Sequence, residues 1–354
     1  MSSLNPAVFR RRLLRWYETH KRDLPWRRTG DPYAIWVSES MLQQTQVGTV
    51  IPYYRRFMRA FPTFEALDRA PLARVLALWS GLGYYRRAEN LKRTARIVMQ
   101  RHCGRLPESY EELRTLPGIG EYTAGALLSI AFGRPYPAVD GNARRVLGRV
   151  FFPADETKIR EIARSFVSKT KPGQFNQSLM ELGSVVCTPA NPACVACPIA
   201  PLCAAHKRRP RLPRPLSQKR SEPRPVLWPL AIVRRSGKVL LRRRAAQGVL
   251  AGLWELPGGE ETYPPVTDSL LGEHLPEKQH PTAHALHLGE LAHSITNRRI
   301  RAPVFLIEWQ GGTEVRLDAA CWRWVAPESL RRQPTSAMTR KAMKLLAIYE
   351  KSSR

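Results

Sequence analysis

The chain has 354 residues, of which 57 are Lys or Arg and 29 are Asp or Glu, so its formal net charge is +28 at pH 7. Hydrophobic residues make up 43% of the sequence, which excludes wholesale disorder, and the length favours two domains. So large a positive excess indicates an anionic partner, with nucleic acid as the first candidate. There is no long apolar run, and residues 1–20 lack the apolar core of a signal peptide. We therefore expect a cytoplasmic protein without a membrane-spanning segment.

Apolar residues recur at helical spacing through the first part of the chain, to about His206. Glycine and proline stops separate these stretches, as in Ser80-Gly81-Leu82-Gly83. The clearest sets are Leu72–Val75–Leu76–Trp79, Leu91–Ala95–Val98 and Ile159–Ile162–Phe166. The pattern predicts an all-α domain over residues 1–206.

Two carboxylates in this first part are candidates for acid–base chemistry. Glu39 lies in an apolar stretch with little other charge, where a carboxyl group has a raised pKa and can donate a proton near neutrality. Asp140 directly precedes a predicted helix over residues 143–150, and the helix N-terminus would keep it ionised. Two carboxylates with separated acidities can break a glycosidic bond. The alternatives are a solvated glutamate and an ordinary helix cap.

A glycine turn joins two short predicted helices in the middle of the first domain. Ser109–Glu112 has the form of a capping box, and the turn that follows its helix is Leu116-Pro117-Gly118-Ile119-Gly120. A second helix is predicted from Glu121 to Phe132. Backbone N–H groups at its start can bind a phosphate without reading sequence, so we expect Leu116, Gly118 and Gly120 to contact a nucleic-acid backbone.

Four of the six cysteines form the spacing C-x6-C-x2-C-x5-C, namely Cys187, Cys194, Cys197 and Cys203. Four thiolates within one short loop can surround a single metal centre. Zinc usually takes two C-x2-C pairs, and this loop has one, so a cubane iron–sulfur cluster fits better. Zinc and coincidental clustering are the alternatives. Cys103 and Cys321 have no such neighbours and are expected to be packing residues.

The composition changes after His206. Residues 207–225 are rich in basic residues and proline, which is typical of an extended, solvated linker. Beyond it, residues 226–350 are predicted to form a smaller α+β domain that closes with a helix over Ala337–Glu350. Its predicted strands are Val226–Arg234, Val239–Arg242, Val304–Trp309 and Cys321–Val325.

Together, Leu116–Gly120, Asp140 and the cysteine loop resemble the helix-hairpin-helix DNA glycosylases related to endonuclease III. Four further segments are similar to the MutY family of adenine DNA glycosylases: Leu24–Arg27, Ser38–Val47, Gly81–Tyr85 and Val139–Asn142. The match runs from Leu13 to about Cys203 and continues weakly to the C-terminus. The resemblance implies a helix-hairpin-helix domain with one [4Fe-4S] cluster in the loop 187–203, followed by a Nudix-like domain.

This resemblance implies roles for individual residues. Glu39 would protonate adenine and later handle the water, and Asp140 would stabilise or capture the sugar cation, with Tyr122 and Asn142 assisting. Arg27 and Gln177 would contact the everted adenine, and Gln44 and Tyr84 would enter the duplex around the mispair. Bifunctional relatives carry a lysine two residues after the last hairpin glycine, where this chain has Tyr122. A monofunctional glycosylase that leaves an abasic site is therefore predicted.

In the second domain, Leu250–Glu260 resembles the entry to a Nudix fold, but the glutamates that bind magnesium in Nudix hydrolases do not follow it. The family's Phe-Ser-His turn for 8-oxoguanine is best matched by Ile295-Thr296-Asn297, in which Thr296 keeps the hydroxyl. The alternative is an ordinary turn between strands. The resemblance implies a nucleoid-associated monomer acting on duplex DNA with 8-oxoguanine:A or G:A mispairs.

Three other functions compete with this interpretation. An endonuclease III-like pyrimidine lyase is disfavoured by Tyr122. A non-catalytic iron–sulfur DNA-binding protein is disfavoured by the presence of both Glu39 and Asp140. A nucleotide pyrophosphohydrolase is disfavoured by the missing carboxylates of the Nudix-like segment.

Overall fold

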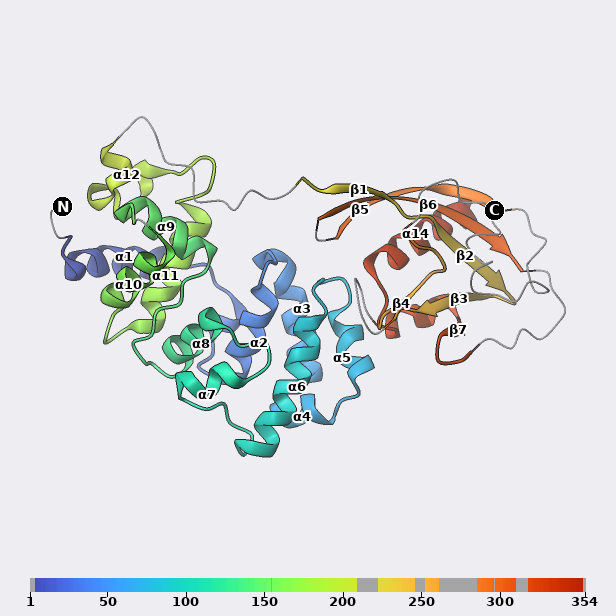
Figure 1. The fold of residues 1–354 in the computed structure, drawn as a ribbon, viewed down its shortest axis with the longest axis horizontal. Coiled ribbons are helices and arrows are strands. Elements are labelled where there is room, and N and C mark those ends of the chain that lie inside the picture. Colours follow the sequence, from blue (N-terminus) through green and yellow to red (C-terminus); the bar gives the residue numbers. More distant parts are fainter. Residues whose placement is uncertain are drawn as a thin grey trace. The chain divides into compact units, whose positions relative to one another are not determined.

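The structure is a computed structural model that describes residues 4–153, 155–208, 222–245, 252–260, 285–295, 297–309 and 318–352. The chain folds into two compact units. The helical unit comprises Met1–Ala70 and Arg86–Gln218, and the sheet unit comprises Pro71–Tyr85 and Lys219–Arg354 (Figure 1). Within the described ranges, no helix combines the length and apolar character needed to cross a membrane.

Helices make up the helical unit, as the apolar periodicity predicts. Most begin at a side-chain cap: Asn5, Asp31, Thr63, Ser109, Asp140 and Asp155 each accept a backbone N–H of the first turn. The α-helices are α1 (Pro6–His20), α2 (Pro32–Leu42), α3 (Val47–Ala60), α4 (Phe64–Arg69), α6 (Arg86–Arg101), α7 (Tyr110–Thr115), α8 (Glu121–Ala126), α9 (Gly141–Phe151), α10 (Glu156–Phe166), α11 (Pro172–Val185) and α12 (Ala204–Lys207).

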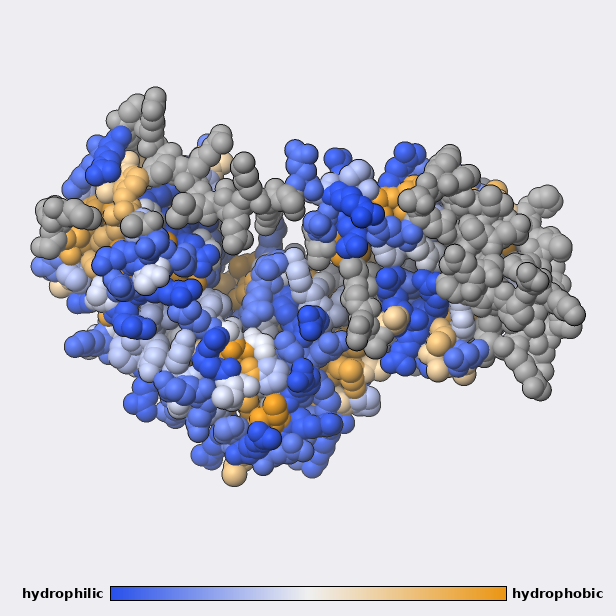
Figure 2. Space-filling view, viewed as in Figure 1, coloured by the Kyte–Doolittle hydropathy of each residue, from blue (hydrophilic) through white to orange (hydrophobic). Residues whose placement is uncertain are grey.

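Two regions of the core position the residues of interest. Helices α1, α9, α10 and α11 share one apolar cluster, in which Phe9, Leu147, Phe175 and Leu179 are almost fully buried. Helix α2 is buried on nearly every side, from Tyr33 to Met41, because apolar residues occupy most of its positions. The outer surface differs: hydrophilic side chains predominate on the face in Figure 2, in keeping with the charge of +28.

The predicted second helix of the hairpin changes its hydrogen bonding halfway. Helix α8 ends at Ala126, and a π-helix covers Leu127–Ala131, whereas one helix to Phe132 was expected. The hydroxyl of Ser129 donates to the carbonyl oxygen of Gly125 at 2.7 Å, and Asn176 Nδ2 donates to that hydroxyl at 2.8 Å. A serine hydroxyl that donates to the carbonyl oxygen four residues earlier competes with the backbone hydrogen bonds of the helix and often bends it. The spacing of apolar residues does not reveal such a change.

A mixed sheet forms the centre of the sheet unit. Strand β6 pairs antiparallel with β5, and β1 and β2 lie end to end along its other side, both parallel to it. Strand β3 follows β2 and pairs with both β4 and β7. The strands are β1 (Arg224–Leu227), β2 (Leu230–Arg235), β3 (Lys238–Arg243), β4 (Trp254–Glu255), β5 (Leu286–Ile295), β6 (Arg298–Glu308) and β7 (Trp322–Val325). Helix α14 (Ala337–Ser352) packs against β5 and β2.

Two strand predictions need correction. The single strand expected over Val226–Arg234 is divided into β1 and β2 at Trp228–Pro229, because proline has no N–H for the ladder. Strand β5, which was not predicted from the sequence, is only half-buried and carries an irregularity between His287 and Gly289. Its weak hydrophobic alternation explains the omission.

A segment from the first half of the chain belongs to the sheet unit. Helix α5 (Leu72–Trp79) contacts a 3-10 helix at Pro327–Arg332. The buried Ser80 hydroxyl donates to the carbonyl oxygen of Thr335 at 2.5 Å and accepts a hydrogen bond from Arg340. Tyr85 O–H donates to the same carbonyl at 3.3 Å. The sequence prediction had placed these residues in one continuous domain over 1–206.

Candidate active site

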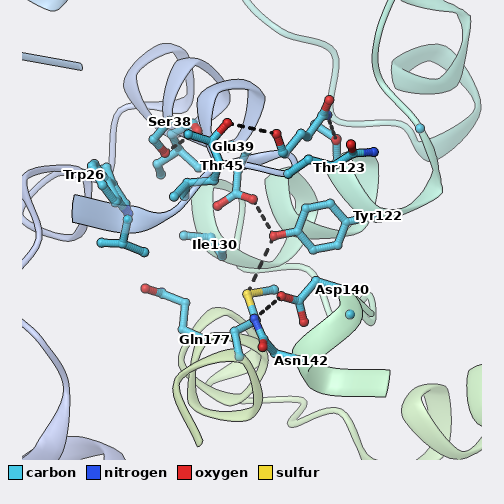
Figure 3. A pocket seen from close by; sticks show the side chains of 18 of the residues that line it. Trp26, Ser38, Glu39, Thr45, Tyr122, Thr123, Ile130, Asp140, Asn142 and Gln177 are labelled. Atoms are coloured by element: carbon cyan, nitrogen blue, oxygen red, sulfur yellow. Dashed lines mark hydrogen bonds between the residues drawn. The ribbon is translucent and has the colours of Figure 1, made fainter. Parts of the chain in front are cut away.

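A cavity of about 1090 Å³ opens into the helical unit. Its walls come from α2, from the hairpin between α7 and α8, from the start of α9 and from α11 (Figure 3). It gathers candidates that are far apart in the sequence, namely Arg27, Glu39, Gln44, Leu116, Gly118, Gly120, Tyr122, Asp140, Asn142 and Gln177. All candidate residues of the first domain except Tyr84 and the cysteines therefore line one cavity.

Glu39 lies on the buried helix α2 with 5% of its surface exposed. The phenol of Tyr122 donates to Glu39 Oε2 at 2.5 Å and also approaches Met180 Sδ at 3.7 Å (Figure 3). Burial raises the pKa of Glu39 to about 7, and the nearby Asp140 adds to the rise, whereas the Tyr122 hydrogen bond opposes it. A sizeable fraction of Glu39 is therefore protonated at neutral pH.

Asp140 caps the N-terminus of α9 at the opposite wall of the cavity. Its Oδ1 accepts the Ala143 N–H at 2.7 Å, and its Oδ2 accepts Asn142 Nδ2 at 2.9 Å (Figure 3). Burial raises the pKa of Asp140, and the hydrogen bonds from Ala143 and Asn142 oppose this rise. The sequence position indicated the helix terminus but not the burial. These hydrogen bonds favour the ionised carboxylate, which can stabilise a nearby cation.

Glu181, which was not predicted from the sequence, is the charged centre of a third wall. It has no exposed surface, and its oxygens accept Arg22 Nε at 2.6 Å and Arg27 Nη2 at 2.7 Å. Burial would raise the pKa of Glu181, but the two arginines outweigh it and lower the pKa. Beside them, Tyr17 O–H donates to Gln177 Oε1 at 3.1 Å. Glu181 follows Gln177 by four residues on α11, and this helical spacing was the available signal.

The residues expected to enter the duplex lie in unusual backbone conformations. Gln44, two residues after the end of α2, has a φ of 55°. Tyr84, in the sheet unit, has a φ of 50° and is 49% exposed. Residues other than glycine rarely adopt a left-handed backbone conformation. Where they do, the surrounding structure must stabilise that conformation. In the sheet unit, Asn297 is exposed at the turn between β5 and β6. Thr296 lies outside the described residues.

The four loop cysteines, Cys187, Cys194, Cys197 and Cys203, surround a cavity of about 30 Å³. Burial raises the pKa of Cys197 to about 11, and its three cysteine neighbours add to the rise, which reflects their proximity. The buried Arg149 donates to Cys187 Sγ at 3.3 Å. Among the described residues, no group of His, Cys, Asp or Glu is arranged around a single metal ion. The four thiols line one small cavity beside a buried cation, and thiols have the donor chemistry of an anionic metal–sulfur group.

A chain of hydrogen bonds joins the cysteine loop to the cavity. Arg145 Nε donates to the carbonyl oxygen of Cys187 at 2.8 Å, and Arg145 Nη2 donates to Asn142 Oδ1 at 2.8 Å. Asn142 in turn donates to Asp140. The conformation of the cysteine loop therefore bears directly on the orientation of Asp140.

Comparisons with known proteins agree with this organisation. The family model of HhH-GPD superfamily base excision DNA repair proteins matches residues 37–172, and a NUDIX domain model matches residues 230–345. The chain is 37% identical to the adenine DNA glycosylase of Rattus norvegicus, over 98% of this chain and 79% of that protein. It is 35% identical to the adenine DNA glycosylase of Homo sapiens, over 97% of this chain and 74% of that protein.

Solved structures resemble the helical unit. A thermostable thymine-DNA glycosylase matches with a TM-score of 0.54 and 32% identity, over 57% of this chain and 96% of that chain. An endonuclease III trapped as a covalent intermediate with DNA matches with a TM-score of 0.51 and 23% identity, over 59% and 100% of the two chains. At that identity, the second match concerns the fold alone.

The helix-hairpin-helix unit, its cavity and the NUDIX match define a DNA N-glycosylase of the base excision repair class. The predicted fold class is thereby confirmed for both parts of the chain. More narrowly, the chain belongs to the adenine DNA glycosylase family, because its rat and human relatives match it along about three quarters of their own length.

Proposed function

We propose that this protein hydrolyses the N-glycosidic bond of adenine that is mispaired with 8-oxoguanine or guanine in duplex DNA. The observation that carries the proposal is the pair of carboxyl groups in one cavity: the buried Glu39, whose pKa burial raises to about 7, and Asp140, which accepts hydrogen bonds from N–H donors. The names of the relatives, adenine DNA glycosylases, support adenine as the base removed.

The reaction requires the target nucleotide to leave the base stack, because its glycosidic bond is inaccessible inside the duplex. Glu39 donates its proton to a ring nitrogen of the everted adenine, so the departing base leaves as a neutral molecule. The sugar keeps the positive charge, which the Asp140 carboxylate stabilises. Water attacks the anomeric carbon and transfers its proton to the Glu39 carboxylate, which restores the acid and leaves an abasic site.

A panel of duplexes tests this proposal. Purified protein is incubated with duplexes that place A opposite 8-oxoguanine, G, C or T, and the products are treated with alkali to cleave abasic sites. We expect adenine release from the 8-oxoguanine and G duplexes and intact DNA with A:T. Removal of thymine or of an oxidised pyrimidine instead of adenine would refute the proposed substrate.

The proposed enzyme is monofunctional and does not cleave the strand. Tyr122 occupies the hairpin position at which bifunctional relatives carry a lysine, and the described residues that line the cavity include no lysine. An amine is needed for the Schiff base that leads to β-elimination. Borohydride added during turnover should therefore trap no protein–DNA adduct, and strand breaks should require alkali. An adduct at a lysine would contradict this assignment.

We also propose that the sheet unit recognises 8-oxoguanine on the opposite strand. The NUDIX match and the turn between β5 and β6, which holds Asn297 at the surface, support this role, and Thr296 is the proposed hydroxyl contact. Single-turnover rates on 8-oxoguanine:A and G:A duplexes measure it. Substitution of Thr296 and Asn297 by alanine should reduce the preference between the two duplexes, and an unchanged preference would refute the contact.

For the cysteine loop, we propose one [4Fe-4S] cluster with Cys187, Cys194, Cys197 and Cys203 as ligands. When bound, the cluster would supply a rigid centre for the loop and would take no part in hydrolysis. The cavity among the thiols and the adjacent Arg149 support the assignment. Four iron atoms per protein with a broad visible absorption band are expected, and one zinc ion in colourless protein would refute it.

A further inference from the structure

Arg87 is a buried cation behind the cavity wall, and it takes no part in the proposed chemistry. It is the second residue of α6 and is 9% exposed. Its Nη1 donates to three backbone carbonyls, those of Ser40 at 3.0 Å, Met41 at 2.8 Å and Gln43 at 2.6 Å. Its Nη2 donates to Thr45 Oγ1 at 3.2 Å. One guanidinium therefore binds four groups within six consecutive residues.

The carbonyls that Arg87 binds lie at the end of α2. The last carbonyls of a helix have no partner within the helix and must be satisfied from outside. Helix α2 ends at Leu42, and the chain then passes through Gln43 into the left-handed conformation of Gln44. Arg87 is thus the cap of α2, and it fixes the chain on both sides of the bend. A charged hydrogen bond is stronger than a neutral one and therefore holds this geometry firmly.

The capped segment carries two functional groups of the cavity. Glu39 directly precedes Ser40, the first residue bound by Arg87, and Gln44 lies between the last two. Gln43 Nε2 also donates to Thr123 Oγ1 of α8 at 3.3 Å. A rotation of the last turn of α2 would consequently move both the Glu39 carboxyl group and the Gln44 side chain.

Helix α6 supports the hairpin turn as well. Thr94 Oγ1 donates to the carbonyl oxygen of Pro117 at 2.9 Å. Gly118, at a φ of +80°, packs so closely on α6 that an added Cβ would lie 2.9 Å from Asn90 Cβ. Arg87, Asn90 and Thr94 are spaced by three and four residues, so they share one face of the helix. A single rigid element therefore contacts both the end of α2 and the turn proposed to bind phosphate.

We infer that Arg87 is a positioning residue that sets the direction of Glu39 and Gln44 relative to the hairpin turn. Through α6, it keeps the acid and the duplex-entering side chain in register with the DNA backbone. This inference rests on the proposed adenine excision for its kinetic consequence. It rests also on the expected entry of Gln44 into the duplex, so displacement of Gln44 should impair eversion of the target base whether or not adenine is then removed.

The first test uses Arg87→Gln, Arg87→Lys and, as a matched control, Arg101→Gln. Arg101 is an exposed arginine at the last position of the same helix, about 21 Å along the axis from Arg87. The single-turnover excision rate should fall at least tenfold in Arg87→Gln, and the duplex dissociation constant should change less than threefold. Arg87→Lys keeps a charged donor but loses the planar guanidinium with its several N–H groups, so its excision rate should lie between those of Arg87→Gln and the wild type. The control should match the wild type.

The second test measures eversion without chemistry. In a Glu39→Gln background, a duplex with 2-aminopurine at the target position reports eversion as a rise in fluorescence. We expect the increase in 2-aminopurine fluorescence to be at least halved when Arg87→Gln is added. With Arg101→Gln the increase should be unchanged. Should Arg87→Gln prove unfolded by circular dichroism, the same comparison is made with Arg87→Lys.

The outcomes separate this inference from the proposed function. Wild-type protein that everts the base but leaves adenine in place would refute adenine excision, and the fluorescence result would still decide the role of Arg87. Folded Arg87 variants with wild-type rate and fluorescence would overturn the inference. A loss of rate matched by an equal loss of duplex binding would also overturn it, because Arg87 would then act on the DNA interface as a whole.

Discussion

Replacement of Glu39 by glutamine should stabilise the protein at alkaline pH while abolishing excision. The pKa of Glu39 is raised from 4.5 to about 7 by burial, so the folded state binds its proton more tightly than the unfolded state does. The resulting stabilisation is present below pH 4.5 and is lost as the pH rises to 7. At about 1.4 kcal/mol for each pH unit, an ionised Glu39 costs about 3 kcal/mol above pH 7.

Glutamine carries no charge and can still accept the hydrogen bond from Tyr122. We therefore expect the variant and the wild type to unfold alike near pH 4.5 and to diverge by about 3 kcal/mol at pH 8.5. For a unit of about 200 residues, this difference corresponds to a rise in Tm of roughly 6–12 °C. Thermal and urea unfolding of the full chain at pH 4.5, 6, 7 and 8.5 would measure it. Excision by the wild type should fall over the same range, as the acid loses its proton above pH 7.

Glu161→Gln is the matched control, because Glu161 is an exposed carboxylate of α10 with 56% of its side chain accessible. Its substitution should leave the pH dependence of unfolding parallel to that of the wild type. This reasoning would be refuted if the free energy of unfolding of the Glu39→Gln variant had the same pH dependence as that of the wild type across pH 4.5–8.5. The Glu39 carboxyl would then be hydrated in the folded state and could not serve as a proton donor near neutrality.

Three further outcomes are expected. Asp140→Asn should lower single-turnover excision at least a hundredfold with little change in duplex affinity; a variant within threefold of the wild-type rate would remove Asp140 from the mechanism. Gly183→Ala should slow excision more than tenfold, because the added Cβ would lie 2.6 Å from Asn142 Cβ. Gly148→Ala is the control and should retain the wild-type rate, because no atom lies within 4 Å of its added Cβ. Duplex affinity should fall steeply between 50 and 200 mM salt, as expected for a chain of charge +28 that releases counterions from DNA, and salt-independent binding would exclude this electrostatic contribution.

Several features of the site follow from local sequence. The apolar residues around Glu39 predict a buried carboxyl group, and the structure gives α2 almost no solvent-facing side. The glycines of Leu116–Gly120 predict a tight turn, and Gly118 adopts a positive φ there. Such features depend on residues that are close together in the sequence, so they can be predicted from the sequence alone.

Other features depend on contacts between distant segments. Glu181 is buried because Arg22 and Arg27, 159 and 154 residues away, neutralise it. Arg87 is one of 57 basic residues, and nothing in its own neighbourhood distinguishes a buried cap from a phosphate contact. Burial at Asp140 likewise comes from its surroundings and raises the pKa that a helix terminus alone would lower. Long-range packing of this kind has no signature in spacing or composition.

The placement of Pro71–Tyr85 within the sheet unit affects how the protein can be dissected. A polypeptide that ends before Lys219 would keep this segment but lose the carbonyl oxygen of Thr335, which the buried Ser80 and Tyr85 hydroxyls share. Those hydroxyls and the apolar face of α5 would then meet water. A truncated enzyme with weak activity would therefore not reveal which of two changes was responsible, the missing C-terminal residues or the altered segment 71–85. Point substitutions at Ser80 would be the cleaner comparison.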